Sequence, residues 1–196
     1  MDVQSAVDKR EAIEDAALAL FVEQGFHGTT VPEIARRAGV GTGTLYLYHA
    51  SKDELLNALL LKWCRAVADS IQAATRRATT PRAVFAAHWE AAVEFSEQYS
   101  AAWDFLMAFH DSPYIALETR RDIDAIKAPL VSIFYTGVEQ GVFKPLPPEL
   151  LHTVCVGIMS QVRVLAVRGD TPVTPELWRA AEAMAWEAIS CRKSKV

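Results

Sequence analysis

The fold of this chain is decided by Thr29–Leu55, which reads TTVPEIARRAGVGTGTLYLYHASKDEL. Thr30 can cap a helix that carries Pro32 in its first turn and Glu33 at the spacing of a capping box. Apolar residues recur on one face of this helix, and Gly39 follows them. Because glycine readily adopts the left-handed conformation that ends many helices, the pattern predicts a short helix that closes in a tight turn.

A second short helix is predicted to begin near Gly41 or Thr42 and to run to Tyr48, and a third to begin after Ser51, with Glu54 at the capping-box spacing. Two short helices joined by a glycine turn form a helix-turn-helix, whose second helix enters the major groove of DNA. Small hydroxyl groups and tyrosines suit contacts with phosphates and thymine methyl groups. The residues predicted to contact DNA are Thr29, Thr30, Arg36, Arg37, Thr42, Gly43, Thr44, Tyr46, Tyr48 and Lys52.

The segment Phe26–Leu56 resembles the N-terminal DNA-binding domain of the TetR (tetracycline-repressor) family of bacterial regulators. The resemblance combines an aromatic-x-x-Thr-Thr entry, an IAxxAGV segment, a GTLYxY recognition helix and an SKxEL restart. Gly41 and Thr42 stand where the family commonly has Ser and Lys, and His49 stands where Phe is usual. The departures leave the operator sequence open, and the absent lysine removes one DNA contact that the family would imply.

The composition places the chain among globular proteins without a membrane span. It has 196 residues, of which 51% are hydrophobic, and no run of about 18 uncharged apolar residues. The acidic, amphipathic N-terminal segment is not a signal peptide. Three widely spaced cysteines, Cys64, Cys155 and Cys191, form no metal or redox motif. We therefore expect a reducing, cytoplasmic location.

The net charge of −4 does not by itself indicate nucleic-acid binding. The first 52 residues also hold more acids than bases. However, Arg36, Arg37 and Lys52 flank the proposed DNA-contacting helix, whereas most of the acids lie in the first helix. The position of the bases, rather than their number, favours DNA binding.

The remaining chain shows helical periodicity and no alternating strand pattern. Pro129 is expected to kink or split one helix near Ala128. We predict an all-α fold of about nine helices, with a three-helix DNA-binding domain over residues 1–50 and a larger helical domain over 51–196. Beyond the helix-turn-helix, the expected helices cover about 8–24, 52–78, 82–98, 101–110, 116–140, 149–168 and 177–190.

Other kinds of site are not supported by the sequence. Gly39–Thr44, GVGTGT, lacks the third glycine and the preceding strand of a dinucleotide-binding loop. No two histidines stand at the i, i+4 spacing of a helical metal site. Cys64 and Cys155 fall on apolar helical seams, and no nucleophile elbow is present. We therefore expect no cofactor, no metal and no catalysis.

The larger domain is rich in aromatic residues at helical spacing, which usually form a core but can also line a pocket between helices. The TetR resemblance implies that this domain binds a small effector, and the aromatic lining favours a largely apolar one. Trp103, Met107 and His110 recur at i, i+4 and i+7 and so share a helical face. The residues predicted to bind the ligand are Trp89, Trp103, Met107, His110, Phe134 and Met159.

The resemblance also implies dimerisation through the last two long helices. Small and apolar faces on these helices fit that role, namely Ile158, Val162, Leu165, Ala181, Ala185 and Ala188. We expect a homodimeric repressor that binds a palindromic operator in double-stranded DNA and is released by its effector. An activator or a ligand-dependent DNA binder is the alternative within this class. A helical small-molecule carrier with a vestigial DNA unit is the alternative from another class, favoured by the weak basic charge.

Overall fold

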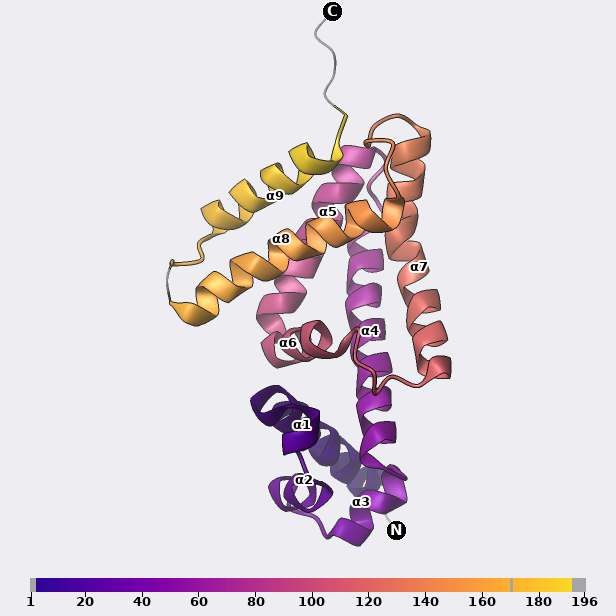
Figure 1. The fold of residues 1–196 in the computed structure, drawn as a ribbon, viewed down its shortest axis with the longest axis vertical. Helices are drawn as coiled ribbons and strands as arrows, with labels where there is room; N and C mark the ends of the chain where they lie inside the picture. Colours follow the sequence, from indigo (N-terminus) through magenta and orange to yellow (C-terminus); the bar gives the residue numbers. More distant parts are fainter. Residues whose placement is uncertain (1–2, 170, 192–196) are drawn as a thin grey trace, which may run out of the picture. The chain divides into compact units, whose positions relative to one another are not determined.

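The computed structural model describes the backbone of residues 3–169 and 171–191, with side chains from residue 8 onward in these ranges. This part of the chain forms nine helices and one isolated β-bridge, so the all-α prediction is confirmed (Figure 1). The helices are α1 (Val3–Gly28), α2 (Val31–Arg37), α3 (Thr42–Tyr48), α4 (Lys52–Thr75), α5 (Pro81–Gln98), α6 (Ser100–Phe109), α7 (Leu117–Glu139), α8 (Pro148–Arg168) and α9 (Pro175–Ile189).

Two glycines set the helix-turn-helix apart from its surroundings. Gly25 interrupts α1 with φ 71° and ψ 178°, and Gly39 follows α2 with φ 68°, so both have the positive φ that favours glycine, as predicted for Gly39. Thr30 is the N-cap of α2, but its side chain makes no capping hydrogen bond, and the predicted capping box at α2 does not form. The backbone carbonyl of Thr30 instead accepts hydrogen bonds from the amides of Glu33 and Ile34.

The second predicted capping arrangement, at the start of α4, is present. The amide of Glu54 donates to the Ser51 hydroxyl oxygen over 3.0 Å, and the Glu54 carboxylate accepts a hydrogen bond from the amide of Ala50. These bonds satisfy donors that a helix start would otherwise leave without partners. They also fix the turn that joins α3 to α4.

The described residues group into two compact units. The first unit lies within Met1–Ala66 and Gln98–Asp124, and the second within Val67–Glu97 and Ala125–Val196. The first unit therefore contains α1 to α3, the first part of α4, and α6. α6 belongs to this unit because it packs on α1. The second unit contains α5, α8, α9 and most of α7.

The core of the first unit is built around Phe21 of α1. Its ring centroid lies 6.0 Å from Phe26, 6.1 Å from Phe105 and 6.0 Å from Phe109. Phe21 is 1% exposed, and Ile13 on the same helical stripe is fully buried. The apolar stripe that the sequence predicts for the first helix therefore faces the core.

The core of the second unit is a chain of aromatic rings. Phe143 lies 5.7 Å from Phe134 and 5.6 Å from Trp186, and Trp186 lies 5.3 Å from Phe85, all between ring centroids. Gly137 of α7 makes room for this arrangement, because a Cβ atom there would lie 2.1 Å from the Phe143 ring. Glycine at this position allows the loop after α7 to fold back onto the helix.

α7 continues through Pro129, so the expected split near Ala128 does not occur. Proline removes the amide that would donate to the carbonyl of Ala125 four residues earlier. Ala125 is exposed, so water can satisfy this carbonyl and the helix can continue.

Candidate functional site

α2 and α3 form a helix-turn-helix in the first unit. Ile34, Ala35 and Leu45 are at most 1% exposed and hold the two helices together. The turn between them is closed by the amide of Val40, which donates to the carbonyl of Ala35 over 3.0 Å, and by the amide of Gly39. The buried contacts therefore turn one side of α3 inward and leave its other side free.

The outward side of α3 is formed by Thr42, Gly43, Tyr46 and Leu47, which we call the recognition face. At about 100° per residue, these four positions fall on one continuous arc of the helix. All four are exposed, with Tyr46 at 52% and Leu47 at 78%. The other two predicted contacts on α3 are half-buried. By the same geometry Thr44 lies next to this face, whereas Tyr48 lies on the opposite side of the helix.

Leu47 is a candidate contact that the sequence analysis did not identify. Among the described residues no large apolar side chain is more exposed. Leu45, two residues earlier, is fully buried, and residues two apart lie on nearly opposite sides of a helix. The burial of Leu45 was therefore a usable signal that Leu47 faces outward.

Two predicted contact residues support the turn before α2. Thr29 is fully buried, and its hydroxyl donates to the carbonyl of Gly25 over 2.8 Å, so this side chain is not available to DNA. The ammonium of Lys52 donates to the carbonyls of Phe26 and Thr29 over 2.6 and 2.7 Å and lies 4.1 Å from the Phe26 ring centroid. Lys52 thus has two of its three protons committed within the protein.

The neighbouring arginines of α2 differ in their surroundings. Arg37 makes a two-pronged ion pair with Glu23, with N–O distances of 2.7 and 2.8 Å. This hydrogen bonding lowers the pKa of the Glu23 carboxyl, which keeps the pair charged. Arg36 and Thr30 are both exposed, and no ion pair is found for Arg36 among the described residues. Arg36 is therefore the sharper candidate for a phosphate contact.

The six predicted ligand residues divide between the two units. Trp89, Phe134 and Met159 are buried in the second unit, at 5%, 1% and 3% exposure. Trp103 is buried in the first unit, where Met107 is half-buried and His110 is exposed. Neither unit by itself assembles all six.

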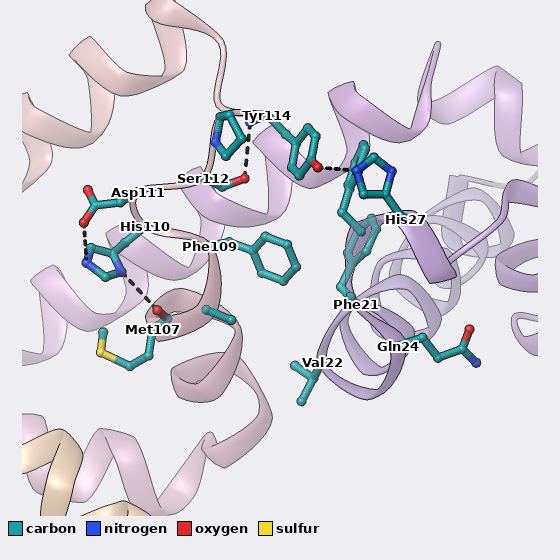
Figure 2. Close-up of a pocket in the computed structure, with 14 residues that line it drawn as sticks. Phe21, Val22, Gln24, His27, Met107, Phe109, His110, Asp111, Ser112 and Tyr114 are labelled. Atoms are coloured by element: carbon teal, nitrogen blue, oxygen red, sulfur yellow. Dashed lines mark hydrogen bonds and ion pairs between the residues drawn. The ribbon is translucent and has the colours of Figure 1, made fainter.

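Met107 and His110 line a hollow of about 670 Å³ in the first unit. Figure 2 shows the rings of Phe21 and Phe109 at this hollow, with the phenol of Tyr114 hydrogen-bonded to His27 Nε2. His110 pairs with the Asp111 carboxylate at 2.9 Å and contacts the Met107 carbonyl through Nδ1 at 3.1 Å. The polar groups here largely satisfy one another. The other lining residues are Val22, Gln24, Gly25, Phe26, Ala108, Ser112 and Pro113.

A pair of histidines accompanies the aromatic rings of the second unit. His88 and His152 lie 6.3 Å apart, and Phe134 lies 6.3 and 5.6 Å from them respectively, between ring centroids. Burial lowers the pKa of both imidazoles to about 4, assisted at His88 by the charge of His152 and at His152 by that of Lys127. Both rings are therefore neutral near pH 7. Nδ1 of His88 is buried with no hydrogen-bond partner among the described residues.

Two of the three predicted dimer residues on α9 face the interior of this chain and not its surface. Ala181 and Ala185 are 4% and 0% exposed within this chain, because they pack inward, so a partner subunit cannot contact them. Ala188 is exposed, as are Ala183 and Met184 beside it. The outward face of α9 therefore combines these small and apolar residues with the exposed charges of Arg179 and Glu187, and it lies about one residue away from the predicted one.

α8, which packs beside α9 (Figure 1), is apolar and incompletely covered. Val162 is 8% exposed, whereas Ile158 and Leu165 are half-buried and Val167 is 75% exposed. Among the described residues α8 alone is long and apolar enough to cross a membrane by length and composition, which the sequence analysis did not expect. Only 22% of its apolar window is buried within the chain, so α8 presents a surface that another apolar body can cover.

A helix-turn-helix carried by an otherwise helical chain defines the class of helix-turn-helix DNA-binding regulators. Residues 13–59 match the model of bacterial regulatory proteins of the tetR family, and residues 61–191 match that of the tetracyclin repressor-like C-terminal domain. The chain belongs to the TetR family. It is a ligand-responsive transcriptional regulator and not an enzyme.

Individual relatives agree with this assignment. The transcriptional regulator BetI of Rhizobium meliloti is 34% identical over 116 residues, which cover 58% of this chain and 56% of BetI. The transcriptional repressor KstR2 of Mycobacterium tuberculosis is 29% identical over 141 residues, 70% of each chain. A solved tetR family transcription regulator from Shewanella sp. PV-4 has a TM-score of 0.82 at 30% identity, covering 94% of this chain and 99% of its own.

Proposed function

We propose that this protein is a homodimeric repressor that binds a palindromic operator and releases it when a small, largely apolar effector binds. The observation that carries the proposal is the recognition face of α3. A seven-residue helix exposes Thr42, Gly43, Tyr46 and Leu47 together while Leu45 anchors it. A hydroxyl, an aromatic ring, an apolar side chain and a bare backbone position together suit the bases and phosphates of a major groove.

The proposed dimer is supported by the outward faces of α8 and α9. Val167 and Met184 are 75% and 64% exposed, and small residues surround Met184. A second copy of the chain that covers these faces would bury apolar surface that is otherwise in contact with water. Two subunits would then present two copies of α3 to half-sites separated by one or more DNA turns of about 34–36 Å. On this basis the interface comprises Ile158, Leu165, Val167, Ala183, Met184 and Ala188.

The effector site is proposed beside the histidine pair of the second unit. Phe134 lies 6.3 and 5.6 Å from the two imidazoles, between ring centroids, and His88 has a buried ring nitrogen with no hydrogen-bond partner among the described residues. Because both imidazoles are neutral near pH 7, they would hydrogen-bond an uncharged polar group rather than pair with an anion. The ligand class is therefore a largely apolar molecule that carries a carbonyl or hydroxyl group.

Effector binding must favour a subunit conformation that fits the operator less well. A coupling of about 1–3 kcal/mol is sufficient. The effector has to bind the two conformations unequally, since equal binding shifts nothing. α4 and α7 each contribute residues to both units, so they are the segments through which a change in one unit would reach the other.

The proposal is tested by gel shifts with the chain's own upstream DNA over a salt series, with and without candidate apolar effectors. We expect binding that weakens steeply with salt and is reversed by an effector. Binding that requires the effector would indicate a ligand-dependent DNA binder instead. Effector binding without any DNA binding would support the carrier.

The effector site is tested separately with His88→Phe, which keeps a ring but removes the free nitrogen. We expect this variant to bind DNA normally and to need about tenfold more effector, the cost of one lost hydrogen bond. Met107→Ala, in the hollow of the first unit, is the matched control. A normal response in His88→Phe together with a lost response in Met107→Ala would move the site to that hollow.

A further inference from the structure

His49 ends α3 and is surrounded by charged groups inside the first unit. Its side chain is completely buried, and its amide donates to the carbonyl of Leu45 over 3.0 Å, which closes the last turn of α3. Neither ring nitrogen has a hydrogen-bond partner among the described residues. A buried imidazole without partners is costly, so the identity of its neighbours decides what this ring does.

Two carboxylates face the ring from opposite sides. Nε2 lies 3.8 Å from Glu14 Oε1 on α1, and Nδ1 lies 3.6 Å from Glu54 Oε1 on α4. A neutral imidazole has one N–H group, so one nitrogen would turn a lone pair toward a carboxylate. An imidazolium has two N–H groups and a positive charge, so it is attracted to both carboxylates at these ion-pair distances, which are too long for hydrogen bonds. The geometry therefore fits the protonated ring better than the neutral one.

The surrounding charges are also compatible with a proton on this ring. On α1, Arg10 binds Glu14 at 2.9 Å, and on α4, Lys62 binds it at 2.7 Å. Burial alone would raise the pKa of Glu14, but the hydrogen bonds from Lys62 and Arg10 outweigh burial and lower it. Glu14 therefore stays ionised well into the acidic range. Counted at their formal charges, the two bases, the two carboxylates and a protonated His49 carry one net positive charge.

We propose that protonated His49 is a positioning residue for DNA binding, bridging Glu14 and Glu54 so that α3 is held between α1 and α4. The inference rests on the proposed function, because it assumes that the orientation of α3 matters for DNA. Glu54 also accepts a hydrogen bond from Ala50, so the bridge fixes the turn directly behind the recognition face. Loss of the proton would remove one charged contact at each side of the ring and loosen the end of α3.

The sign of the pH dependence follows from this arrangement. The bridge exists while the His49 ring is protonated and is lost as the pH rises. The state that binds DNA holds this proton, so raising the pH, which removes the proton, disfavours that state. Glu14, whose pKa is lowered, keeps its charge across the range in which imidazoles titrate, roughly pH 6 to 8. DNA binding should therefore weaken toward alkaline pH in that range.

The test has one arm without DNA and one arm with it. In the first, nitrogen NMR of the imidazole rings across this range reports the protonation of His49 in the free protein. We expect both ring nitrogens protonated at the acidic end. In the second, a duplex that binds the protein is titrated at each pH. We expect wild-type affinity to fall about threefold to tenfold from pH 6 to 8, consistent with proton linkage.

Variants separate the bridge from simple packing. His49→Phe retains an aromatic ring and should give a flat pH profile, and Glu54→Gln, which can still accept from Ala50, should flatten it in part. His110→Gln, at an exposed histidine of the same unit, should keep the wild-type slope. A neutral His49 ring throughout, or equal slopes for wild type and His49→Phe, overturns the inference. If NMR shows a protonated His49 ring but the protein binds no DNA, the proposed function is wrong. The ion-pair bridge from His49 to Glu14 and Glu54 would still be supported.

Discussion

The recognition face on α3 and the outward faces of α8 and α9 both expose apolar side chains, but their neighbours differ. Leu47, at 78% exposure, stands among a threonine, a glycine and a tyrosine on a seven-residue helix. Val167, at 75%, belongs to a long apolar helix beside the alanine-rich α9. Hydroxyls and a bare backbone suit a polar, grooved partner, whereas long helices with many small and apolar exposed residues suit another protein helix. The exposure of an apolar side chain does not by itself indicate which kind of partner it contacts. The residues around that side chain do.

The largest effect is expected when charges are introduced on the outward faces of α8 and α9. Val167→Glu combined with Met184→Glu should give a folded monomer, because both side chains are exposed and charges resist burial in an interface. Operator affinity should fall by about 10² or more, since one subunit loses the advantage of the second half-site. Sedimentation measures the oligomeric state, and Leu117→Glu, at an exposed site of the first unit, is the control. A dimeric double variant would contradict the proposed interface.

The next largest effect is expected for Tyr46 of the recognition face and for Thr44 next to it. Tyr46→Ala and Thr44→Ala should each weaken operator binding about tenfold at fixed salt, the scale of one lost base or backbone contact. Neither change should unfold the protein, because Tyr46 is 52% exposed and Thr44 is half-buried. Tyr135→Ala, at an exposed tyrosine of α7, should have no effect on DNA binding. If both α3 variants bound the operator with wild-type affinity, α3 would not be the helix that contacts DNA.

Substitutions at two glycines, one exposed on α3 and one packed against the core on α7, should have opposite effects on stability and DNA binding. Gly43→Ala places a methyl group in open space and replaces a helical glycine, so stability should hold or rise by up to about 1 kcal/mol. DNA binding should nevertheless weaken severalfold, because the methyl group meets the DNA. Gly137→Ala is the converse, since it drives a Cβ into the buried Phe143 ring and should cost about 1–3 kcal/mol. Thermal unfolding and DNA titration of both variants provide the check.

The smallest effect concerns the basic residues at the edge of the face. Arg36→Ala should weaken all DNA sequences about equally and reduce the slope of log K against log salt by about one. Arg37→Ala should change the slope less, because the structure already pairs Arg37 with Glu23. Lys52→Ala should lower the free energy of unfolding, since Lys52 bonds two carbonyls, and should change the slope of log K against log salt by less than one. Equal slopes for wild type and Arg36→Ala would exclude that phosphate contact.

The helix-turn-helix was predictable because its signals are local. Gly39 has the positive φ predicted for the residue that ends α2, and Leu45 and Ile34 are buried as their spacing indicates. Class, helix number and most helix ends follow from such short-range patterns. The missing cap at Thr30 shows the limit, because whether a hydroxyl turns toward an amide depends on the fold around it.

The ligand and dimer residues were less predictable because they depend on which way each helix turns. Ala181 and Ala185 form a small-residue face, but periodicity does not say whether such a face meets the core of its own chain or a partner. In the same way Trp103 and Trp89 share a residue type but belong to different units. The surroundings of His49 and His88 come from residues distant in the sequence, so no local pattern could indicate them.

The central claim is that the recognition face of α3 selects DNA sequence, and selection from a random duplex library tests it most directly. Wild-type protein should enrich an inverted repeat whose half-sites are separated by about 10–10.5 base pairs or a multiple of that spacing. The Tyr46→Ala, Leu47→Ala double variant should lose this enrichment while it keeps weak, salt-sensitive binding to any duplex. Enrichment of the same repeat by the double variant, or no enrichment by the wild type, would contradict the account.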